Sequence, residues 1–160
     1  MFDYIRVSSA VPALSVGNTE LNTDNICKMI VQSAEKDADI VSFPELAVTG
    51  YTCGDLFFQK TLLDSAVKGI ERIIESAAHN KISVIVGAPL TIDGQLYNCA
   101  VVISDGKIAG ISVKTFIPNY SEFYEKRWFS SSDNITRSTV GIAELGITKF
   151  GDYDIPVGRD

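Results

Sequence analysis

The chain has 160 residues, of which 46% are hydrophobic and 21% charged, so it can bury a core and does not have the composition of a disordered tail. Its formal net charge of -6 argues against a nucleic-acid surface, because neutralising phosphates needs clustered cations. No apolar run approaches the ~20 residues that span a bilayer, and residues 1–20 lack the basic and apolar regions of a signal peptide. We therefore expect a soluble, cytoplasmic protein that binds neither nucleic acid nor membrane.

The three cysteines and the single histidine do not form a recognisable metal or disulfide pattern. Cys27, Cys53 and Cys99 have no C-x-x-C spacing, and their number is odd. His79 lies at what reads as a polar helix end, where an imidazole suits the last carbonyls better than a catalytic role. The sequence therefore predicts no metal site and no disulfide framework.

The first half of the chain alternates strand and helix patterns. Residues 5–10 read as a short strand, and a helix follows with Ile26, Ile30 and Ala34 at four-residue spacing. Residues 38–43 form a short apolar run, typical of a strand with both faces covered. The order strand, helix, strand predicts a parallel, right-handed unit.

A second helix is predicted at residues 61–81, with its apolar side on the sheet. Another covered strand is expected at 82–90. The predicted apolar stripe of the helix consists of Leu63, Val67, Ile70, Ile74 and Ala77.

Residues 91–114 contain two Asp-Gly pairs, Asp93-Gly94 and Asp105-Gly106, each flanked by β-branched residues. This is the strongest short-range hairpin signal, and it predicts three antiparallel strands in a meander. The expected fold class is α/β, of the α+β type: a mixed sheet with two helices on one face. From Phe116 onward we expect a structured loop or short helix, followed at 140–160 by further strands and turns, with no sign of a domain end.

Two charged residues stand at predicted strand ends. Glu45 follows the strand at 38–43, at the carboxyl edge of a mainly parallel sheet, where ligand sites concentrate. A partly desolvated carboxylate suits a general base, although a surface glutamate that caps the next turn explains the segment equally well. Lys114 ends the third meander strand and can stabilise a developing oxyanion; taken alone, it reads more simply as a solvated lysine.

The segments "FPELAVTGY" and "KTFIPNYSEFYEKRWF" together resemble the N-terminal portion of the nitrilase-type, or carbon-nitrogen hydrolase, family. Within it, "GYTCGDLF" and "PNYSEFYEKRWF" are similar to the glutaminase domain of glutamine-dependent NAD synthetases. The resemblance covers nearly the whole chain. It implies a nitrilase-like α-β-β-α sandwich, incomplete here, of which residues 1–160 form the N-terminal part.

The resemblance also implies a Glu-Lys-Cys catalytic set acting on the side-chain amide of glutamine. Glu45 matches the general base and Lys114 the lysine that stabilises the oxyanion. One of two glutamates in the loop after Lys114 orients the lysine, and the sequence does not decide which. The supporting and substrate-binding positions implied by the resemblance are Tyr51, Tyr120, Glu122, Phe123 and Glu125.

The nucleophile has no match in this chain. In the family it lies well downstream of the lysine, in a Cys-Glu-Asp segment, whereas no cysteine follows Cys99 here. Cys53 falls in a loop segment and Cys99 in a strand, where a small apolar side chain packs well. We therefore expect that these residues are the first part of a longer protein whose nucleophile lies further along the sequence, and that the chain is inactive by itself. Its exposed apolar faces should favour a homo-oligomer.

The predicted function is the ammonia-producing part of a glutamine-dependent NAD synthetase, which amidates nicotinic acid adenine dinucleotide. Glutamine is the expected substrate, and a C-terminal synthetase domain that uses ATP and Mg is expected beyond residue 160; no cofactor or metal is expected within the chain. The alternatives are a stand-alone nitrilase or amidase of other specificity and a non-catalytic interaction module with the nitrilase fold. The sequence after residue 160 separates the three.

Overall fold

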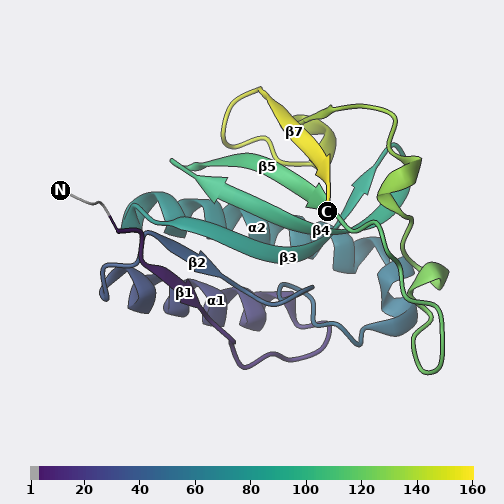
Figure 1. Cartoon of the computed structure of the whole chain (residues 1–160), viewed down its shortest axis with the longest axis horizontal. Helices are drawn as coiled ribbons and strands as arrows, with labels where there is room; N and C mark the ends of the chain where they lie inside the picture. Colours follow the sequence, from purple (N-terminus) through teal and green to yellow (C-terminus); the bar gives the residue numbers. More distant parts are fainter. Residues whose placement is uncertain (1–3) are drawn as a thin grey trace.

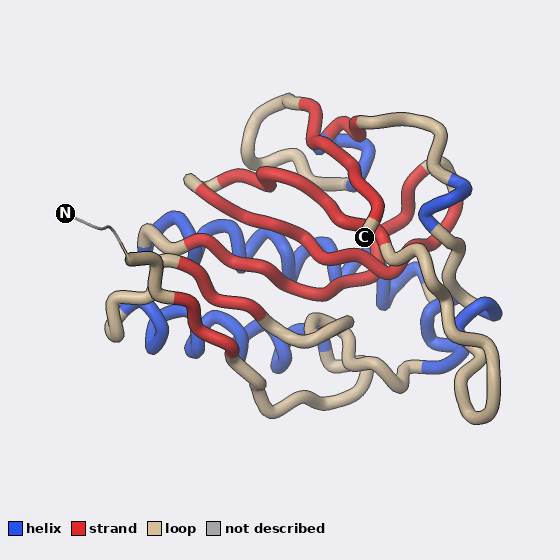
Figure 2. The backbone as a smooth tube through the Cα atoms, viewed as in Figure 1, coloured by secondary structure: helices blue, strands red, loops and turns tan. Residues whose placement is uncertain are grey.

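The computed structural model describes residues 4–160, which form a seven-stranded mixed sheet with two long helices on one face (Figure 1). Neighbouring strands follow the order β1-β2-β3-β4-β5-β7-β6, and the tube view traces them as adjacent red segments (Figure 2). The strands are β1 (Val7–Ser9), β2 (Ile40–Ser42), β3 (Ser83–Ile92), β4 (Gln95–Ser104), β5 (Lys107–Val113), β6 (Thr139–Gly141) and β7 (Asp154–Arg159). The helices are α1 (Thr19–Ala34) and α2 (Lys60–Asn80), with short 3-10 helices η1 (Gly54–Phe58), η2 (Glu125–Arg127), η3 (Ser132–Asn134) and η4 (Ile142–Leu145).

The predicted connectivity is confirmed. Strands β1, β2 and β3 pair in parallel, and α1 and α2 make the two crossovers between them. Strands β3, β4 and β5 form the antiparallel meander. At both hairpins the Asp-Gly pairs have positive φ, as type I′ turns require. The segment after residue 138 adds β6 and β7, and β7 pairs in parallel with β5.

The buried side of α2 is wider than the predicted stripe. Ile70, Ile74 and Ala77 are buried as expected, but Leu63 and Val67 are only partly buried. The physical reason is that α2 packs on α1 as well as on the sheet: a Cβ added at Gly69 would lie 2.6 Å from Thr23 Oγ1. The buried residues that the periodicity missed are Leu62, Ala66, Gly69 and Ile73.

The two faces of the sheet differ. The expectation that strands 38–43 and 82–90 are covered on both faces is wrong for β2 and the start of β3, whereas residues 86–90 of β3 are buried without a break, with the turn after β2 lying over Gly87. Both helices lie behind the sheet in Figure 1, so residues such as Val41 and Val84 are fully buried. Their neighbours Ser42 and Ile85 point to the opposite side and remain partly exposed. The described residues thus supply one sheet and one helix layer, and we call the uncovered side of β2 to β5 the open face.

Candidate functional site

Glu45 is fixed by the close approach of its backbone to β3. The chain leaves β2 and crosses the edge of β3 at Gly87, where a Cβ would lie 2.6 Å from the carbonyl oxygen of Pro44. The Val48 N–H donates to the Gly87 carbonyl at 3.2 Å. Leu46 has a φ of 51°, a left-handed conformation that a leucine rarely adopts and that the surrounding contacts must enforce. The turn that carries Glu45 is therefore rigidly positioned by packing.

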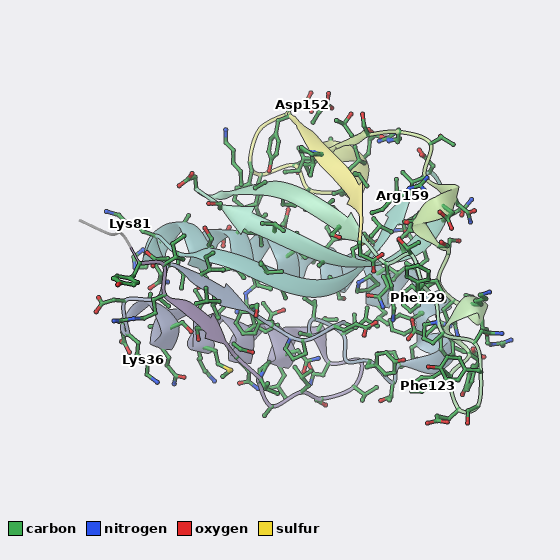
Figure 3. The ribbon with its side chains drawn as sticks, in the orientation of Figure 1. Lys36, Lys81, Phe123, Phe129, Asp152 and Arg159 are labelled. Atoms are coloured by element: carbon green, nitrogen blue, oxygen red, sulfur yellow. The ribbon has the colours of Figure 1, made fainter. Side chains whose placement is uncertain are left out.

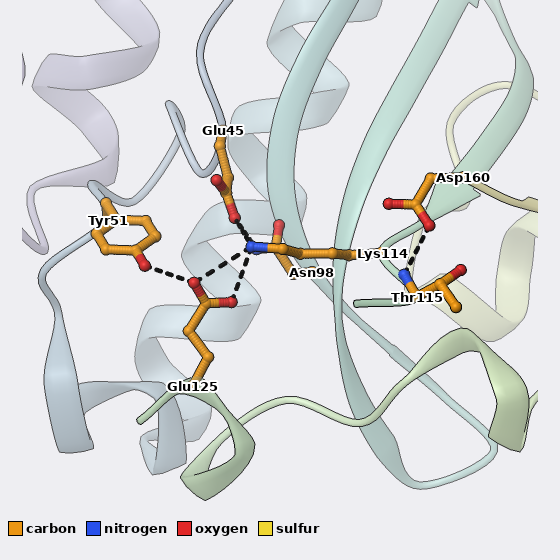
Figure 4. Close-up of polar contacts among 7 residues, drawn as sticks. All are labelled: Glu45, Tyr51, Asn98, Lys114, Thr115, Glu125 and Asp160. Carbon is orange, nitrogen blue, oxygen red and sulfur yellow. Dashed lines mark hydrogen bonds and ion pairs between the residues drawn. The ribbon is translucent and has the colours of Figure 1, made fainter. Parts of the chain in front are cut away.

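Lys114 lies between two glutamates. It follows β5 directly, and its main-chain N–H donates to the Asn98 carbonyl of β4 at 3.0 Å. Its Nζ is 2.7 Å from Glu45 Oε1 and 3.0 Å and 3.2 Å from Glu125 Oε2 and Oε1 (Figure 4). Side chains from two distant strand ends and one loop therefore meet at a single ammonium group.

Glu125 is the buried member of this cluster. The Glu125 side chain is 4% exposed, against 23% for Lys114 and 43% for Glu45. The Tyr51 hydroxyl donates to Glu125 Oε1, and the Glu125 N–H donates to the Pro118 carbonyl at 3.1 Å, which fixes the start of η2. A buried carboxylate needs such partners, because an unpaired charge away from water is costly. We call Glu45, Tyr51, Lys114 and Glu125 the charged cluster.

The environment keeps Lys114 cationic and Tyr51 protonated. Burial alone lowers the pKa of the Lys114 ammonium, but its contacts with Glu45 and Glu125 outweigh burial, so the pKa is raised above its usual value. Burial, and next the hydrogen bond to Glu125, raise the pKa of the Tyr51 phenol. Lys114 can therefore act as a fixed positive charge, and Tyr51 as a hydrogen-bond donor.

Three hollows surround the charged cluster. A depression of about 290 Å³ lies on the open face beside Glu45 and Lys114, and a larger hollow of about 940 Å³ lies between Lys114 and the following loop. Tyr120 lines the larger hollow, is 69% exposed and packs edge-on against Phe123 at 5.7 Å between ring centroids. Phe123 lines the third, of about 130 Å³, together with Tyr51.

The structure thus brings together four of the sequence-predicted residues, Glu45, Tyr51, Lys114 and Glu125, as Figure 4 shows. Tyr120 and Phe123 lie beside the cluster along the hollows. Glu122 is exposed, and a hydrogen bond from Ser121 lowers the pKa of its carboxyl. Of the two glutamates left open by the sequence, it is Glu125 that contacts the lysine. Figure 3 shows Phe123 and Phe129 at the end of the molecule opposite Lys36 and Lys81.

Sequence reasoning missed Asn98 and Gly87. Asn98 is 4% exposed, and its side-chain amide donates to Glu45 Oε1. The available signal was a polar amide inside the apolar run of β4, which needs a partner when buried. Gly87 carried the weaker signal of an isolated glycine in a strand, which often marks close backbone approach.

Neither buried cysteine is placed as a nucleophile. The Cys99 side chain packs in the core on the helix side, and burial raises its pKa despite a hydrogen bond with Leu90. The Cys53 thiol donates to the Thr49 carbonyl at 3.2 Å, and burial raises its pKa as well. Thiolates are the reactive form, so both side chains have a structural environment.

Within residues 4–160, no three His, Cys, Asp or Glu side chains are grouped so that they could hold a metal ion. Among the same residues, neither long helix is apolar enough to cross a lipid bilayer.

The comparison with protein families decides the class of protein. Residues 8–153 match the family model described as carbon-nitrogen hydrolase. The chain belongs to the carbon-nitrogen hydrolase family. The nitrilase-like fold expected from the sequence is confirmed.

Within the carbon-nitrogen hydrolases, this chain is similar to proteins named glutamine-dependent NAD(+) synthetase. It is 38% identical to the one from Aquifex aeolicus over 119 residues, which are 74% of this chain and 21% of that protein. It is 30% identical to the one from Mycobacterium leprae over 142 residues, 89% of this chain and 21% of that protein. The crystal structure of a glutamine-dependent NAD(+) synthetase from Cytophaga hutchinsonii superposes with a TM-score of 0.78 at 32% identity, over 96% of this chain and 25% of that one.

Proposed function

We propose that this chain is the first part of a glutaminase unit that hydrolyses the side-chain amide of glutamine and supplies ammonia for NAD synthesis. The observation that carries the proposal is the contact of one lysine with two glutamates, at 2.7 Å and 3.0 Å, in a carbon-nitrogen hydrolase. Similarity to glutamine-dependent NAD(+) synthetases over most of the chain supports glutamine as the substrate.

In this proposal Glu45 is the general base and Lys114 the electrostatic stabiliser. Glu45 takes the proton of a cysteine thiol supplied by sequence after residue 160, and the thiolate attacks the amide carbon of glutamine. The Lys114 ammonium stabilises the oxyanion of the tetrahedral intermediate. Ammonia leaves with the proton held by Glu45, and water then hydrolyses the thioester to release glutamate and the thiol.

The remaining residues of the site have supporting roles. Glu125, held by Tyr51, orients the Lys114 ammonium through its two oxygens. Tyr120 and Phe123 border the hollows in which the glutamine backbone and the departing ammonia would lie. Glu122 is exposed and is assigned no contact with the lysine.

The whole protein extends the proposal beyond this chain. The chain spans 21% of the Aquifex and Mycobacterium leprae proteins that it matches. We place an ATP- and Mg-dependent synthetase domain, which amidates nicotinic acid adenine dinucleotide in the cytoplasm, in the rest of the protein; no residue of this chain is proposed to bind ATP or Mg. The 160-residue chain is proposed to be inactive and to self-associate through its open face.

The decisive experiment measures glutamine-dependent ammonia release by the gene product extended past residue 160. We expect Glu45→Gln and Lys114→Met to lower kcat about 100-fold or more, because each removes a group that acts in the transition state. Lys36→Met is the control, since Lys36 is exposed at the end of the molecule opposite the charged cluster. Wild-type turnover in both site variants would refute the proposal. Steady turnover by the 160-residue chain alone would refute the proposal that the nucleophile lies after residue 160.

A further inference from the structure

Asn98, on β4, contacts both charged residues of the proposed reaction: the main chain of Lys114 and the carboxylate of Glu45. Its main-chain carbonyl accepts the Lys114 N–H at 3.0 Å, and its side-chain Nδ2 donates to Glu45 Oε1. The residue is 4% exposed and lies in register with Pro89 of β3, next to Ala88 and Cys99, which pair with each other. Asn98 therefore stands at the junction of the strand that precedes Lys114 and the turn that carries Glu45.

A second buried asparagine shows what a purely structural amide looks like in this fold. The Asn22 side chain is fully buried, and its amide bonds only to main-chain atoms, those of Ser15 and Val48. It joins the start of α1 to the loop after Glu45 and contacts no ionisable group in these bonds. The Asn98 side chain instead bonds to a carboxylate of the charged cluster. The two amides are equally sheltered, but only that of Asn98 bonds to a charged group.

The hydrogen bonds to Glu45 are unevenly divided between its two oxygens. Oε1 accepts from Asn98 Nδ2 and from Lys114 Nζ (Figure 4). Within the described residues, both side-chain donors to this carboxylate end on Oε1. A carboxylate oxygen with free lone pairs is the better proton acceptor, and a neutral amide can hold its partner oxygen in place without adding a second positive charge.

We propose that Asn98 is a positioning residue that holds Oε1 of Glu45, so that Oε2 remains the oxygen that accepts the proton of the attacking thiol. The proposal rests on the proposed function. It assigns Asn98 a part in orienting the base, beyond its part in the sheet. Small side chains near it on the open face, those of Ala100 and Ser112, line the depression of about 290 Å³ that Glu45 also lines, and they leave room for the reacting group.

The test compares Asn98→Asp with wild type in the gene product extended past residue 160. Aspartate keeps the size of asparagine but replaces the donor by a second carboxylate facing Glu45. We expect kcat to fall at least about tenfold with KM nearly unchanged. The acidic limb of the pH–kcat profile should move up by about one pH unit or more, because two adjacent carboxylates share a proton. An aspartate introduced away from Glu45 would not move that limb.

Two further variants keep the test decisive. Asn18→Asp is the matched control, because it adds the same charge at the exposed N-cap of α1, which aspartate also caps, and it should leave kcat and the pH profile unchanged. Asn98→Ala removes the donor without adding charge and should lower kcat about tenfold with KM nearly unchanged. If Asn98→Asp does not fold, Asn98→Ala decides: wild-type kcat in that variant overturns the proposal.

A measurement on the carboxyl group itself separates this proposal from the proposed function. In carbon-13 NMR of the extended protein, the Glu45 side-chain carboxyl should titrate at higher pH in Asn98→Asp than in wild type, and should titrate as in wild type in Asn18→Asp. An unchanged titration in Asn98→Asp overturns the positioning role even if glutamine is hydrolysed. Conversely, full activity of Glu45→Gln would reject the proposed function. The effect of the residue at position 98 on the Glu45 carboxyl could still be measured by the same titration.

Discussion

The helix-facing side of the sheet and the open face are built from alternate residues of the same strands, yet they have different compositions. On the helix side, Val84, Val86 and Val101 are large, apolar and fully buried. On the open face, Gly87 pairs with Ala100, and Ala100 with Ser112, which leaves the depression of about 290 Å³ beside Glu45. Because side chains of a strand alternate between faces, one set of strands can supply a packed core and a shallow reactive surface at once.

Stability and the proposed chemistry are therefore largely separated between the two faces of the sheet. The main cluster of buried apolar residues includes Val84, Val86 and Val101 on the helix side, and apolar burial is the dominant favourable contribution to folding. The charged cluster lies at the end of the open face and contains two carboxylates around one lysine, with Glu45 still 43% exposed. The exception is Gly87, where the open face touches the backbone that carries Glu45. Three predictions, two on substitutions and one on pH, test this difference between the faces.

The largest effect is expected at Gly87. A Cβ at residue 87 would overlap backbone atoms of Pro44 and Leu46, which cannot swing aside as a flexible side chain does. We expect Gly87→Ala to lower the free energy of unfolding by about 3 kcal/mol, at the upper end for overpacking. Urea denaturation of this chain measures it. Gly110→Ala is the control on the same face, because its nearest neighbour would be the Pro156 carbonyl oxygen at 3.7 Å; equal losses in both variants would contradict the explanation.

A smaller effect should distinguish two adjacent valines of β4. Val101 is fully buried under the helices, whereas Val102 lies partly exposed on the open face. We expect Val101→Ala to cost about 2 kcal/mol and Val102→Ala less than about 1 kcal/mol, because only the first removes methyl groups from a filled core. Denaturant midpoints at matched m-values test this. Equal costs would show that a second layer covers the open face in solution, as self-association predicts.

The smallest effect concerns pH and belongs to the charged cluster. The pKa values of Lys114 and Tyr51 are raised in the folded protein, so both groups bind protons more tightly when folded than when unfolded. Their contribution to stability is therefore fully present below the unfolded values near about 10 and is lost as the pH rises through the folded values. We expect the free energy of unfolding to fall in alkali.

Urea denaturation between neutral pH and alkali measures this loss, with Lys114→Met and Tyr51→Phe compared with wild type. Each substitution should make the alkaline loss shallower, since it removes a group that titrates. Burial also raises the pKa of Cys99, which contributes to the same loss in every variant. Lys36→Met, at the far end of the molecule and exposed, should leave the pH dependence as in wild type. A slope equally steep in all variants would count against tighter proton binding by the cluster.

Much of the fold was predictable because its signals are local. The Asp-Gly pairs at 93–94 and 105–106 specify the turns of the meander, and positive φ at each is what their chemistry allows. The periodicity of residues 61–81 predicted α2 but not its full buried surface. The contact of Gly69 with Thr23 joins two helices that are separated in sequence, and no pattern within one helix reveals its partner.

The order of strands and helices, the acidic charge, and the positions of Glu45 and Lys114 at strand ends were all predictable from the sequence. These follow from hydrophobic periodicity, turn residues and composition, which act over a few residues. Tertiary packing, which the sequence patterns do not reveal, brings Glu125 rather than Glu122 against Lys114 and Asn98 against Glu45. Those contacts join residues 11 and 53 positions apart, so they depend on how the loop and the strands pack in space.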